Sequence, residues 1–374
     1  MVGMDVAFQG GQLSGWPCQQ PVSLPERLGR PVWVPNEWAE LREVVVGIVD
    51  DMRVPEWHPA MAAVVPAGGR SEVLRRCGSR WPAELQALAR REVDGLADFL
   101  ARQGIEVRRP EPFDHHRPVV TPHFSTGGGF YSTMPRDSLL AINDTIVETP
   151  MAWRSRYFET FAFRTILDDY FRRGARWLAA PKPRLADELW ETRDSESVGG
   201  ADRYGLTESE PVFDAADFTR LGDNVLLGQL STVTNRTGVQ WLQHLLGPDY
   251  TVLAYDFAQP DAMHIDITII PAGPGRVLVN RDEVKMLPDV LQDWEVLPLP
   301  PPEPDSSRPL YFSGETINYN VLFLDEQHVL IEAGQTCLMA QLRRWGFEPI
   351  PLPFKHFQSF GGSFHCATLD IRRG

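Results

Sequence analysis

Hydrophobic and polar positions along the chain repeat a unit in which a helical pattern leads into a short strand. In five stretches, apolar residues recur near the spacing of an amphipathic helix, and a stop residue, usually glycine, ends the stretch. A short apolar strand follows each of them and often runs into prolines. The predicted helices are 84–103, 155–173, 238–247, 288–292 and 335–345, and the strands that follow them lie in 105–110, 175–183, 250–257, 294–300 and 347–354.

Further apolar runs lie between these units and are predicted to be strands. They are 42–49, 138–149, 267–271, 276–280, 320–325 and 329–333. A repeated unit with unequal insertions favours radial or stacked symmetry, because each unit buries its apolar face only against its neighbours. A doubly wound sheet would give a similar alternation of helices and strands. The pattern therefore predicts the α/β class and leaves the arrangement of the sheets open.

The composition is that of an ordinary globular protein. Of the 374 residues, 43% are hydrophobic and 23% are charged, which supplies enough apolar material for a large core. The mean hydropathy is −0.24, and no apolar run approaches the roughly 20 residues that cross a bilayer, so we expect no membrane partner. Residues 1–30 have no signal-peptide pattern and form a polar, Gly/Pro-rich lead segment with the composition of a disordered chain. We expect one catalytic domain over 31–374.

Cysteine usage and net charge narrow the classes of partner. The four cysteines (Cys18, Cys77, Cys337 and Cys366) show no CxxC spacing, which fits free thiols in a reducing cytoplasm. A zinc site would need a cluster of ligands, and no such spacing is present, so no metal is expected. The net charge of −14 would repel a polyanion and argues against nucleic acid. It suits a cationic small molecule, although solubility is the simpler explanation.

One cysteine, Cys366, lies in a segment suited to an active site. Small, flexible residues precede it in SFGGSFHCATLDIRR, and a β-like stretch follows. The glycines allow the backbone a close approach to a ligand. An ordinary thiol, with a pKa of about 8.5, needs a special environment to act as a nucleophile, so a buried and inert cysteine is the simpler interpretation. If the segment is a strand, His365 points away from Cys366.

Acidic residues and one histidine are further candidates. In DAMHIDITIIP, a strand would place His264 and Asp266 on one face, as a polar site or as a solvated surface. Asp214 and Asp217, in FDAADF, have apolar or small neighbours. They are either partly buried acids that need partners or acids at a helix N-terminus. Asp137, in MPRDSLL, precedes a predicted strand, where an acid in a turn is the default interpretation.

Together these residue types fit the chemistry of a guanidinium substrate. Carboxylates match the planar guanidinium fork with pairs of hydrogen bonds. A thiolate can attack its carbon, and a histidine oriented by an acid can carry the proton away and back. The sequence supplies every part, but composition alone does not establish that the parts converge.

Long segments of the chain resemble the amidinotransferase family, which includes glycine amidinotransferase and inosamine-phosphate amidinotransferase. The resemblance extends over 34–373 in the family's order. It is carried by the segments PNEWAELREVVVG, FYSTMPRDSLL, ETPMAWRSRYFE, ARWLAAPKPRLADEL, EPVFDAADF, MHID and GGSFHCATLDIRR. It implies a five-bladed, pseudo-symmetric α/β-propeller, the fold of guanidino-group-modifying enzymes, with no cofactor or metal. It also implies a homodimer.

The resemblance implies roles for individual residues. Cys366 would be the nucleophile, His264 the general acid and base, and Asp214 the partner of His264. Asp137 and Asp266 would grip the guanidinium. The expected reaction moves the amidino group of L-arginine to an acceptor amine and releases L-ornithine. It follows a ping-pong course through an amidino-cysteine intermediate, in a biosynthetic pathway.

The chain departs from the family pattern near the predicted substrate site. Glycine amidinotransferase has an arginine shortly after the HID strand that holds the donor's carboxylate, whereas VLVNRDEV places Glu283 at that position. Arg281, two residues earlier, is the candidate substitute. Ser313 lies where the family has a Ser pair or Ser-Val, but Gly314 follows it here. Ser313 and Met263 complete the predicted substrate-binding residues, and the acceptor stays open.

Two other functions remain as alternatives. An arginine-deiminase-like hydrolase would use the same residues, with water in place of the acceptor amine. A non-catalytic protein that binds guanidino compounds would keep the fold, but the intact set of Cys366, His264 and Asp214 argues against it. A papain-like protease is excluded by the chain order Asp, His, Cys.

Overall fold

The computed structural model of the chain describes all residues except 1–28, 59–60, 62–63, 194–202 and 257–262. Nearly all of the predicted lead segment, 1–30, therefore lies outside the described residues. Within the described part, no helix is both long enough and apolar enough to cross a membrane.

Three-stranded sheets of one repeated design form the framework. Among the described residues, five such sheets have a middle strand that pairs antiparallel with one neighbour and parallel with the other. Their strands are β19 (Thr368–Arg373), β1 (Leu41–Val46) and β2 (Glu106–Arg108); β5 (Leu139–Ile142), β6 (Thr145–Glu148) and β7 (Arg176–Ala179); β10 (Phe218–Arg220), β11 (Val225–Gln229) and β12 (Thr251–Tyr255); β13 (Ile269–Gly273), β14 (Arg276–Val279) and β15 (Glu295–Pro298); β16 (Leu322–Phe323), β17 (His328–Glu332) and β18 (Glu348–Leu352).

A helical segment joins the two parallel strands of each sheet, because a parallel pair needs a crossover connection. These segments are α3 (Ala83–Arg102), α5 (Arg164–Arg172), α6 (Arg236–Leu246), the 3₁₀ turn η7 (Asp289–Leu291) and α7 (Thr336–Arg344). The structure thus confirms the five predicted helix-to-strand units. The second is shorter than predicted, since the 3₁₀ segments η2 (Arg154–Arg156) and η3 (Glu159–Phe163) precede α5.

Further elements fill the connections in the described part of the chain. The helices are α2 (Ala67–Arg76) and α4 (Pro135–Ser138). Two small hairpins consist of β3 (Val119–Val120) with β4 (Ser125–Thr126), and of β8 (Trp190–Arg193) with β9 (Arg203–Leu206). The remaining 3₁₀ segments are η4 (Asp187–Leu189), η5 (Ala215–Asp217), η6 (Ile265–Ile267), η8 (Glu315–Tyr319) and η9 (Phe357–Phe360).

Local sequence explains where the helices begin and end. At the start of α6, the Asn235 side chain accepts a 2.8 Å hydrogen bond from the Gly238 amide, which satisfies one of the free donors of a helix N-terminus. Gly247 ends α6 with φ of 79°, a conformation that favours glycine. Helix α3 buries one face through residues spaced three or four apart, namely Leu85, Ala89, Glu92, Val93, Leu96, Ala97 and Leu100.

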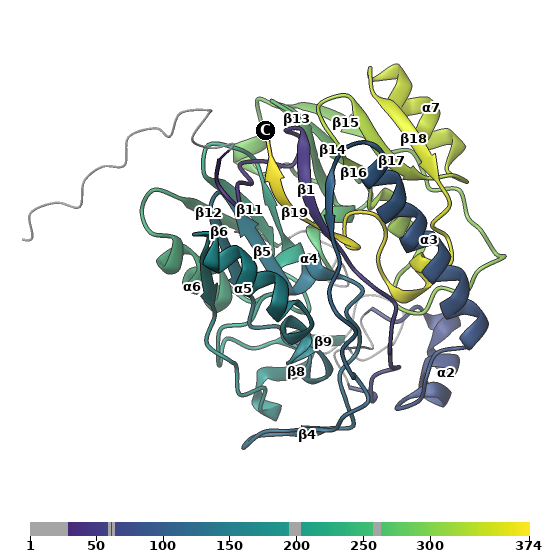
Figure 1. Cartoon of the computed structure of the whole chain (residues 1–374). Helices are drawn as coiled ribbons and strands as arrows, with labels where there is room; N and C mark the ends of the chain where they lie inside the picture. Colours follow the sequence, from purple (N-terminus) through teal and green to yellow (C-terminus); the bar gives the residue numbers. More distant parts are fainter. Residues whose placement is uncertain (1–28, 59–60, 62–63, 194–202, 257–262) are drawn as a thin grey trace, which may run out of the picture.

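The two ends of the described chain meet in one sheet. Strand β19, at the C-terminus, pairs antiparallel with β1, which is the first strand of the chain. In Figure 1, β1 and β19 lie between α5 and α6 on one side and α3 and α7 on the other. The described strands form separate small sheets rather than one large sheet. The α/β class is therefore confirmed, and the doubly wound alternative is wrong.

Candidate active site

In each three-stranded sheet, one outer strand pairs antiparallel with the middle strand, and it is called here the first strand of the sheet. The candidate residues come just before the first strands of different sheets. Asp137 lies in α4, directly before β5, and Asp214 is the N-terminal cap of η5, before β10. His264 and Asp266 lie at the start of η6, before β13, and Cys366 lies in a turn before β19. Helix α4 packs against η5, and η5 packs against η6. The repeat of the fold therefore brings residues that are far apart in sequence to one place.

The fifth sheet contributes Asn320, which follows η8 and precedes β16. Its Oδ1 accepts hydrogen bonds from the backbone amides of Ser363, at 3.1 Å, and Cys366, at 3.0 Å. These bonds fix the turn that carries the cysteine. Sequence reasoning did not assign Asn320, although its place before the first strand of its sheet is the same as that of the other site residues.

Three of the candidates converge on one point. Single side-chain atoms of Asp137, His264 and Cys366 lie within 4.8 Å of one another, and all three residues are buried. Among the described residues this is also the one group of histidine, cysteine and acid whose spacing could hold a metal ion. The arrangement combines a thiol, an imidazole and a carboxylate, which are the parts of a nucleophilic site.

The backbone at His264 is held in a conformation that residues with a side chain rarely adopt. Its φ is 72°, and the backbone amide donates a 3.1 Å hydrogen bond to Asp217 Oδ1. A left-handed backbone at such a residue costs free energy and must be stabilised by its surroundings. The strand predicted from His264 onward is wrong, because β13 begins only at Ile269. A turn, not a strand face, brings His264 and Asp266 to the same site.

Acidic neighbours give His264 an unusual charge. Its Nε2 lies 3.2 Å from Asp214 Oδ2, and its Nδ1 lies 3.8 Å from Asp137 Oδ1. Burial alone would lower the pKa of His264, but Asp137, Asp214 and Asp217 outweigh burial and raise the pKa to about 10. The imidazole is therefore protonated at neutral pH and can donate a proton.

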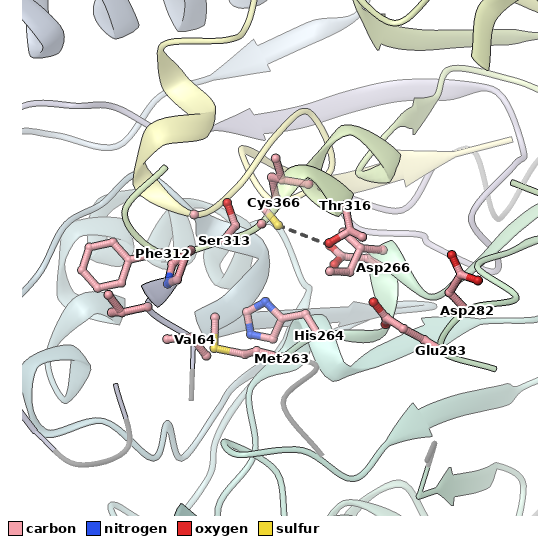
Figure 2. A pocket seen from close by; sticks show the side chains of 16 residues that line it. Val64, Met263, His264, Asp266, Asp282, Glu283, Phe312, Ser313, Thr316 and Cys366 are labelled. Carbon is pink, nitrogen blue, oxygen red and sulfur yellow. Dashed lines mark hydrogen bonds between the residues drawn. The ribbon is translucent and has the colours of Figure 1, made fainter. Parts of the chain in front are cut away.

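Asp266 contacts both residues of the cysteine turn. Its Oδ2 lies 2.7 Å from His365 Nδ1 and accepts a 3.4 Å hydrogen bond from Cys366 Sγ (Figure 2). Burial would raise the pKa of Asp266, but the hydrogen bond and charge of His365 lower it overall, so the group is a carboxylate. The prediction that His365 points away from Cys366 is wrong, because residues 364–367 form a turn and not a strand.

The thiol of Cys366 is neutral near pH 7. The residue is only 2% exposed. Burial raises the pKa of the thiol well above its ordinary value, and the negative charges of Asp266 and Asp137 raise it further. A cation placed between these carboxylates would reverse the effect of their charge.

Several buried carboxylate oxygens of the site accept no hydrogen bond from the described residues. Oδ1 of Asp137, Oδ1 of Asp214 and Oδ1 of Asp266 are buried without a hydrogen-bond donor among the described residues. A buried carboxylate oxygen without a donor is costly, and a guanidinium group offers five N–H donors in one plane. A guanidinium placed among these oxygens would supply the hydrogen-bond donors that they lack.

Arg156 forms ion pairs with three acids of the site, and sequence reasoning did not assign a role to it. Its Nη1 lies 3.0 Å from Asp137 Oδ2 and 3.5 Å from Asp214 Oδ2, and its Nη2 lies 2.8 Å from Glu159 Oε2. Burial raises the pKa of Glu159 to about 8 despite the opposing charge of Arg156. Arg156 lies in ETPMAWRSRYFE, a segment of the family resemblance, and that was the only signal that could have indicated it.

A second buried network supports the cysteine turn from the other side. The Nε of Arg136 donates a 3.0 Å hydrogen bond to the carbonyl of His365, and its Nη2 lies 2.8 Å from Asp370 Oδ1. Glu37 Oε2 lies 2.8 Å from Arg220 Nη2. The ring of His365 is held between Asp266 and Glu37, at 3.4 Å from Glu37 Oε2. These ion pairs hold the turn and Asp266 in fixed positions.

A cavity of about 440 Å³ leads to the thiol. Its described lining includes Cys366, His264 and Asp266 together with two predicted substrate-binding residues, Met263 and Ser313 (Figure 2). The hydroxyl of Ser313 is buried without a partner in the described part of the chain, so it is free to bind a ligand.

The structure places Arg281 apart from the other candidates. Its side chain is exposed and does not belong to the described lining of the cavity. The next two residues, Asp282 and Glu283, do line it. The role of Arg281 in holding the donor's carboxylate stays a prediction.

Comparison with known proteins identifies the family. No protein-family model matches the chain. The chain is 43% identical over 345 residues to L-arginine:L-lysine amidinotransferase of Pseudomonas savastanoi pv. phaseolicola, with 92% of this chain and 94% of that protein covered. The solved structure of SxtG, an amidinotransferase of the saxitoxin pathway from Microseira wollei, is similar with a TM-score of 0.83 and 39% identity, covering 92% of this chain and 97% of that one.

A second solved structure is also similar to this chain. It is the inosamine-phosphate amidinotransferase of Streptomyces griseus, which is similar with a TM-score of 0.80 and 37% identity, and the match covers 91% of this chain and 97% of that one. The resemblance inferred from the sequence segments is thereby confirmed. A buried thiol among acids and a charged histidine, on a framework shared over more than nine-tenths of the chain, lead to one conclusion: the chain belongs to the amidinotransferase family.

Proposed function

We propose that this protein transfers the amidino group of L-arginine to an acceptor amine through a covalent intermediate on Cys366. The observation that carries the proposal is a buried thiol beside two carboxylates, Asp137 and Asp266, each of which has a buried oxygen that accepts no hydrogen bond from the described residues. Two carboxylates can hold the guanidinium fork and set its carbon against the sulfur. The names of the related proteins, which act on L-arginine or transfer amidino groups, agree with this substrate.

Substrate binding also activates the nucleophile in this proposal. The charges of Asp137 and Asp266 keep the Cys366 thiol protonated in the empty site. A bound guanidinium neutralises those charges, so the thiol loses its proton to solvent more easily. The resulting thiolate attacks the guanidinium carbon and forms the C–S bond.

His264 carries the proton in both halves of the cycle. As the imidazolium, it protonates the nitrogen of the leaving ornithine when the C–N bond breaks, which leaves an amidino-thioether on Cys366. The neutral imidazole then accepts a proton from the acceptor amine as this amine attacks, and the Cys366 thiolate departs. Asp214, 3.2 Å from Nε2, orients the ring and stabilises its charged form.

The proposal extends to the arrangement of the chain. We place the five three-stranded sheets as blades around this site, in one catalytic domain over 31–374. The support is that every sheet contributes a site residue just before its first strand. The homodimer and the cytoplasmic location stay predictions from the sequence.

Intact-protein mass spectrometry with arginine and no acceptor tests the proposed function. We expect a mass gain of one amidino group on Cys366 and an equal amount of released ornithine. Cys366→Ser should abolish the adduct. The matched control is Cys337→Ser, which removes an exposed free cysteine and should leave the adduct intact.

Two results would contradict the proposal. Citrulline released without an adduct would indicate the hydrolase alternative, in which water resolves the intermediate. An adduct that persists in Cys366→Ser would exclude this residue as the nucleophile.

A further inference from the structure

His365 is a buried histidine that the proposed mechanism does not use. It comes directly before Cys366 in the turn that precedes β19. Its Nδ1 lies 2.7 Å from Asp266 Oδ2, and its Nε2 lies 3.4 Å from Glu37 Oε2. Ionised carboxylates only accept hydrogen bonds, so the ring nitrogen that bonds to Asp266 carries a proton and donates it. His365 therefore joins the site to a second buried acid, which is far away in the sequence.

The main chain and both neighbours of His365 fix the direction of its ring. The carbonyl oxygen of His365 accepts a 3.0 Å hydrogen bond from Arg136 Nε. On the far side of the ring, Glu37 is held by Arg220, whose Nη2 lies 2.8 Å from Glu37 Oε2 and whose amide donates a 3.1 Å hydrogen bond to Glu37 Oε1. The ring therefore has little freedom to turn, and its Nδ1 stays directed at Asp266.

The two oxygens of Asp266 have different surroundings. Oδ2 accepts hydrogen bonds from His365 Nδ1, at 2.7 Å, and from Cys366 Sγ, at 3.4 Å; Figure 2 shows the second of these bonds. Oδ1 is buried and accepts no hydrogen bond from the described residues. A rotation of the carboxylate would exchange the two oxygens. The donors to Oδ2 therefore determine which oxygen is left for a guanidinium.

One of these two donors is lost during the reaction, and the other is kept. Attack by Cys366 requires the thiolate, and the amidino-thioether that follows has no S–H group. Of the two hydrogen bonds to Asp266 Oδ2, only the one from His365 then remains. A buried carboxylate is held in place by the donors that it retains. His365 is therefore the side chain that can hold Asp266 in both halves of the cycle.

We propose that His365 is a positioning residue, whose Nδ1 hydrogen bond fixes Asp266 so that Oδ1 faces the guanidinium of the donor. His365 does not belong to the described lining of the cavity, so it acts through Asp266 and not on the substrate. This inference rests on the proposed function, and it adds to that site a residue that supports substrate recognition.

Two substitutions of similar chemistry separate the two ring nitrogens. An asparagine carries its amide nitrogen as many bonds from Cα as Nδ1 of histidine, and a glutamine carries it as many bonds from Cα as Nε2. We expect His365→Gln to bind L-arginine about tenfold more weakly, as the loss of a hydrogen bond to a charged group predicts. His365→Asn should stay within about threefold of the unsubstituted protein. Calorimetry in the Cys366→Ser background, in which no adduct forms, measures these Kd values.

L-citrulline and an Asp266 variant test whether His365 acts through Asp266. Citrulline has a neutral ureido group in place of the guanidinium, so it lacks the charge that pairs with a carboxylate. His365→Gln should therefore change the Kd for citrulline by less than about twofold. In Asp266→Asn the affinity for arginine is already reduced, and adding His365→Gln should have little further effect, because the two changes remove one interaction.

A second histidine provides the matched control. His356 Nδ1 lies 2.6 Å from Glu92 Oε1, which is a similar histidine–acid pair outside the described lining of the cavity. His356→Gln should leave the Kd values for arginine and citrulline unchanged.

Several results would overturn the inference. Equal affinities for arginine in His365→Asn and His365→Gln, whether high or low, would exclude a role for Nδ1. Additive losses from His365→Gln and Asp266→Asn would show that the two residues act separately. If His365→Gln gives no cooperative thermal transition, His365→Asn decides alone, because a loss as large as that of Asp266→Asn contradicts the inference.

Adduct formation separates this inference from the proposed function. Failure of the wild-type enzyme to form an adduct with arginine refutes the proposed function and the role of His365 with it. An adduct in the wild type, together with equal affinities in the two His365 variants, overturns the role of His365 alone.

Discussion

Carboxylates in the site determine the charge of two single residues, His264 and Cys366. Near neutral pH an isolated imidazole is largely neutral, yet His264 is charged because Asp137, Asp214 and Asp217 surround it. The same abundance of carboxylates suppresses ionisation of the Cys366 thiol. Asp137 contributes to both effects, because its negative charge raises the pKa of His264 and the pKa of the Cys366 thiol.

The charge of His264 predicts how its contribution to stability depends on pH. The pKa is about 10 in the folded protein and 6.5 for an ordinary histidine, so the folded state binds this proton more tightly. The resulting stabilisation is fully present below pH 6.5 and is lost as the pH rises towards 10. Thermal unfolding of the wild type and of His264→Asn checks this, and the Tm difference should shrink over that range. A difference that stays constant would contradict the assigned charge.

Sequence reasoning found the candidate reactive residues and missed the residues that hold them in place. Cys366, His264 and Asp214 lie in segments whose letters match the family, so their candidacy needed no structure. Asn320 and Arg156 act through contacts across the fold, and nothing in their local sequence specifies those partners. Such contacts depend on how separate turns meet, which periodicity does not describe.

At the scale of elements, short helical turns determine the site. The predicted helix-to-strand units were confirmed because their apolar spacing is regular and glycine ends most of the helices. The turns before the first strands are less regular. The turn at His264 was predicted as a strand, and its actual conformation depends on a hydrogen bond to Asp217, 47 residues away. A local pattern cannot encode a bond of that range.

Arg156 is the link between three of these elements, and its loss should be costly. It pairs with Asp137 of α4, with Asp214 before η5 and with Glu159 of η3. Arg156→Met leaves buried carboxylates without a counter-charge, which we expect to cost about 3–5 kcal/mol in the free energy of unfolding. Denaturant titration measures this, and part of the loss should be recovered at lower pH, where the acids are protonated.

An exposed arginine provides the comparison for this variant. Arg172 pairs with Asp168 at 2.8 Å, and its side chain is 74% exposed. Arg172→Met should change the free energy of unfolding by no more than about 1 kcal/mol. If Arg156→Met were as mild, the three acids would not depend on Arg156.

At the scale of the whole molecule, one sheet contains both the first and the last strand of the described chain. Strand β19 supplies two fully buried residues, Ile371 and Leu369, and pairs with β1 along its length. It also carries Asp370 and Arg373, which are buried ion-pair partners at 2.8 Å. The final residues therefore complete the first sheet of the chain, and they hold the strand that follows Cys366.

Truncation tests this dependence. Removal of residues 368–374 should leave β1 without its antiparallel partner, and we expect a chain that does not fold, as judged by circular dichroism and by the absence of a cooperative thermal transition. Removal of Gly374 alone loses the backbone hydrogen bond from its amide to Glu40, which is 2.8 Å long, and should leave folding intact. A cooperative transition in the longer truncation would show that the sheet tolerates an open edge.

A thiol that ionises only beside a bound cation has a consequence for the lifetime of the enzyme. Peroxides and other electrophiles attack thiolates far faster than thiols, and they attack exposed sulfur before buried sulfur. Cys366 is buried, and its thiol is neutral in the structure described above. Under the proposed function, Cys366 is therefore protected from oxidation at rest, and its damage is confined to the moments of turnover, when substrate fills the cavity.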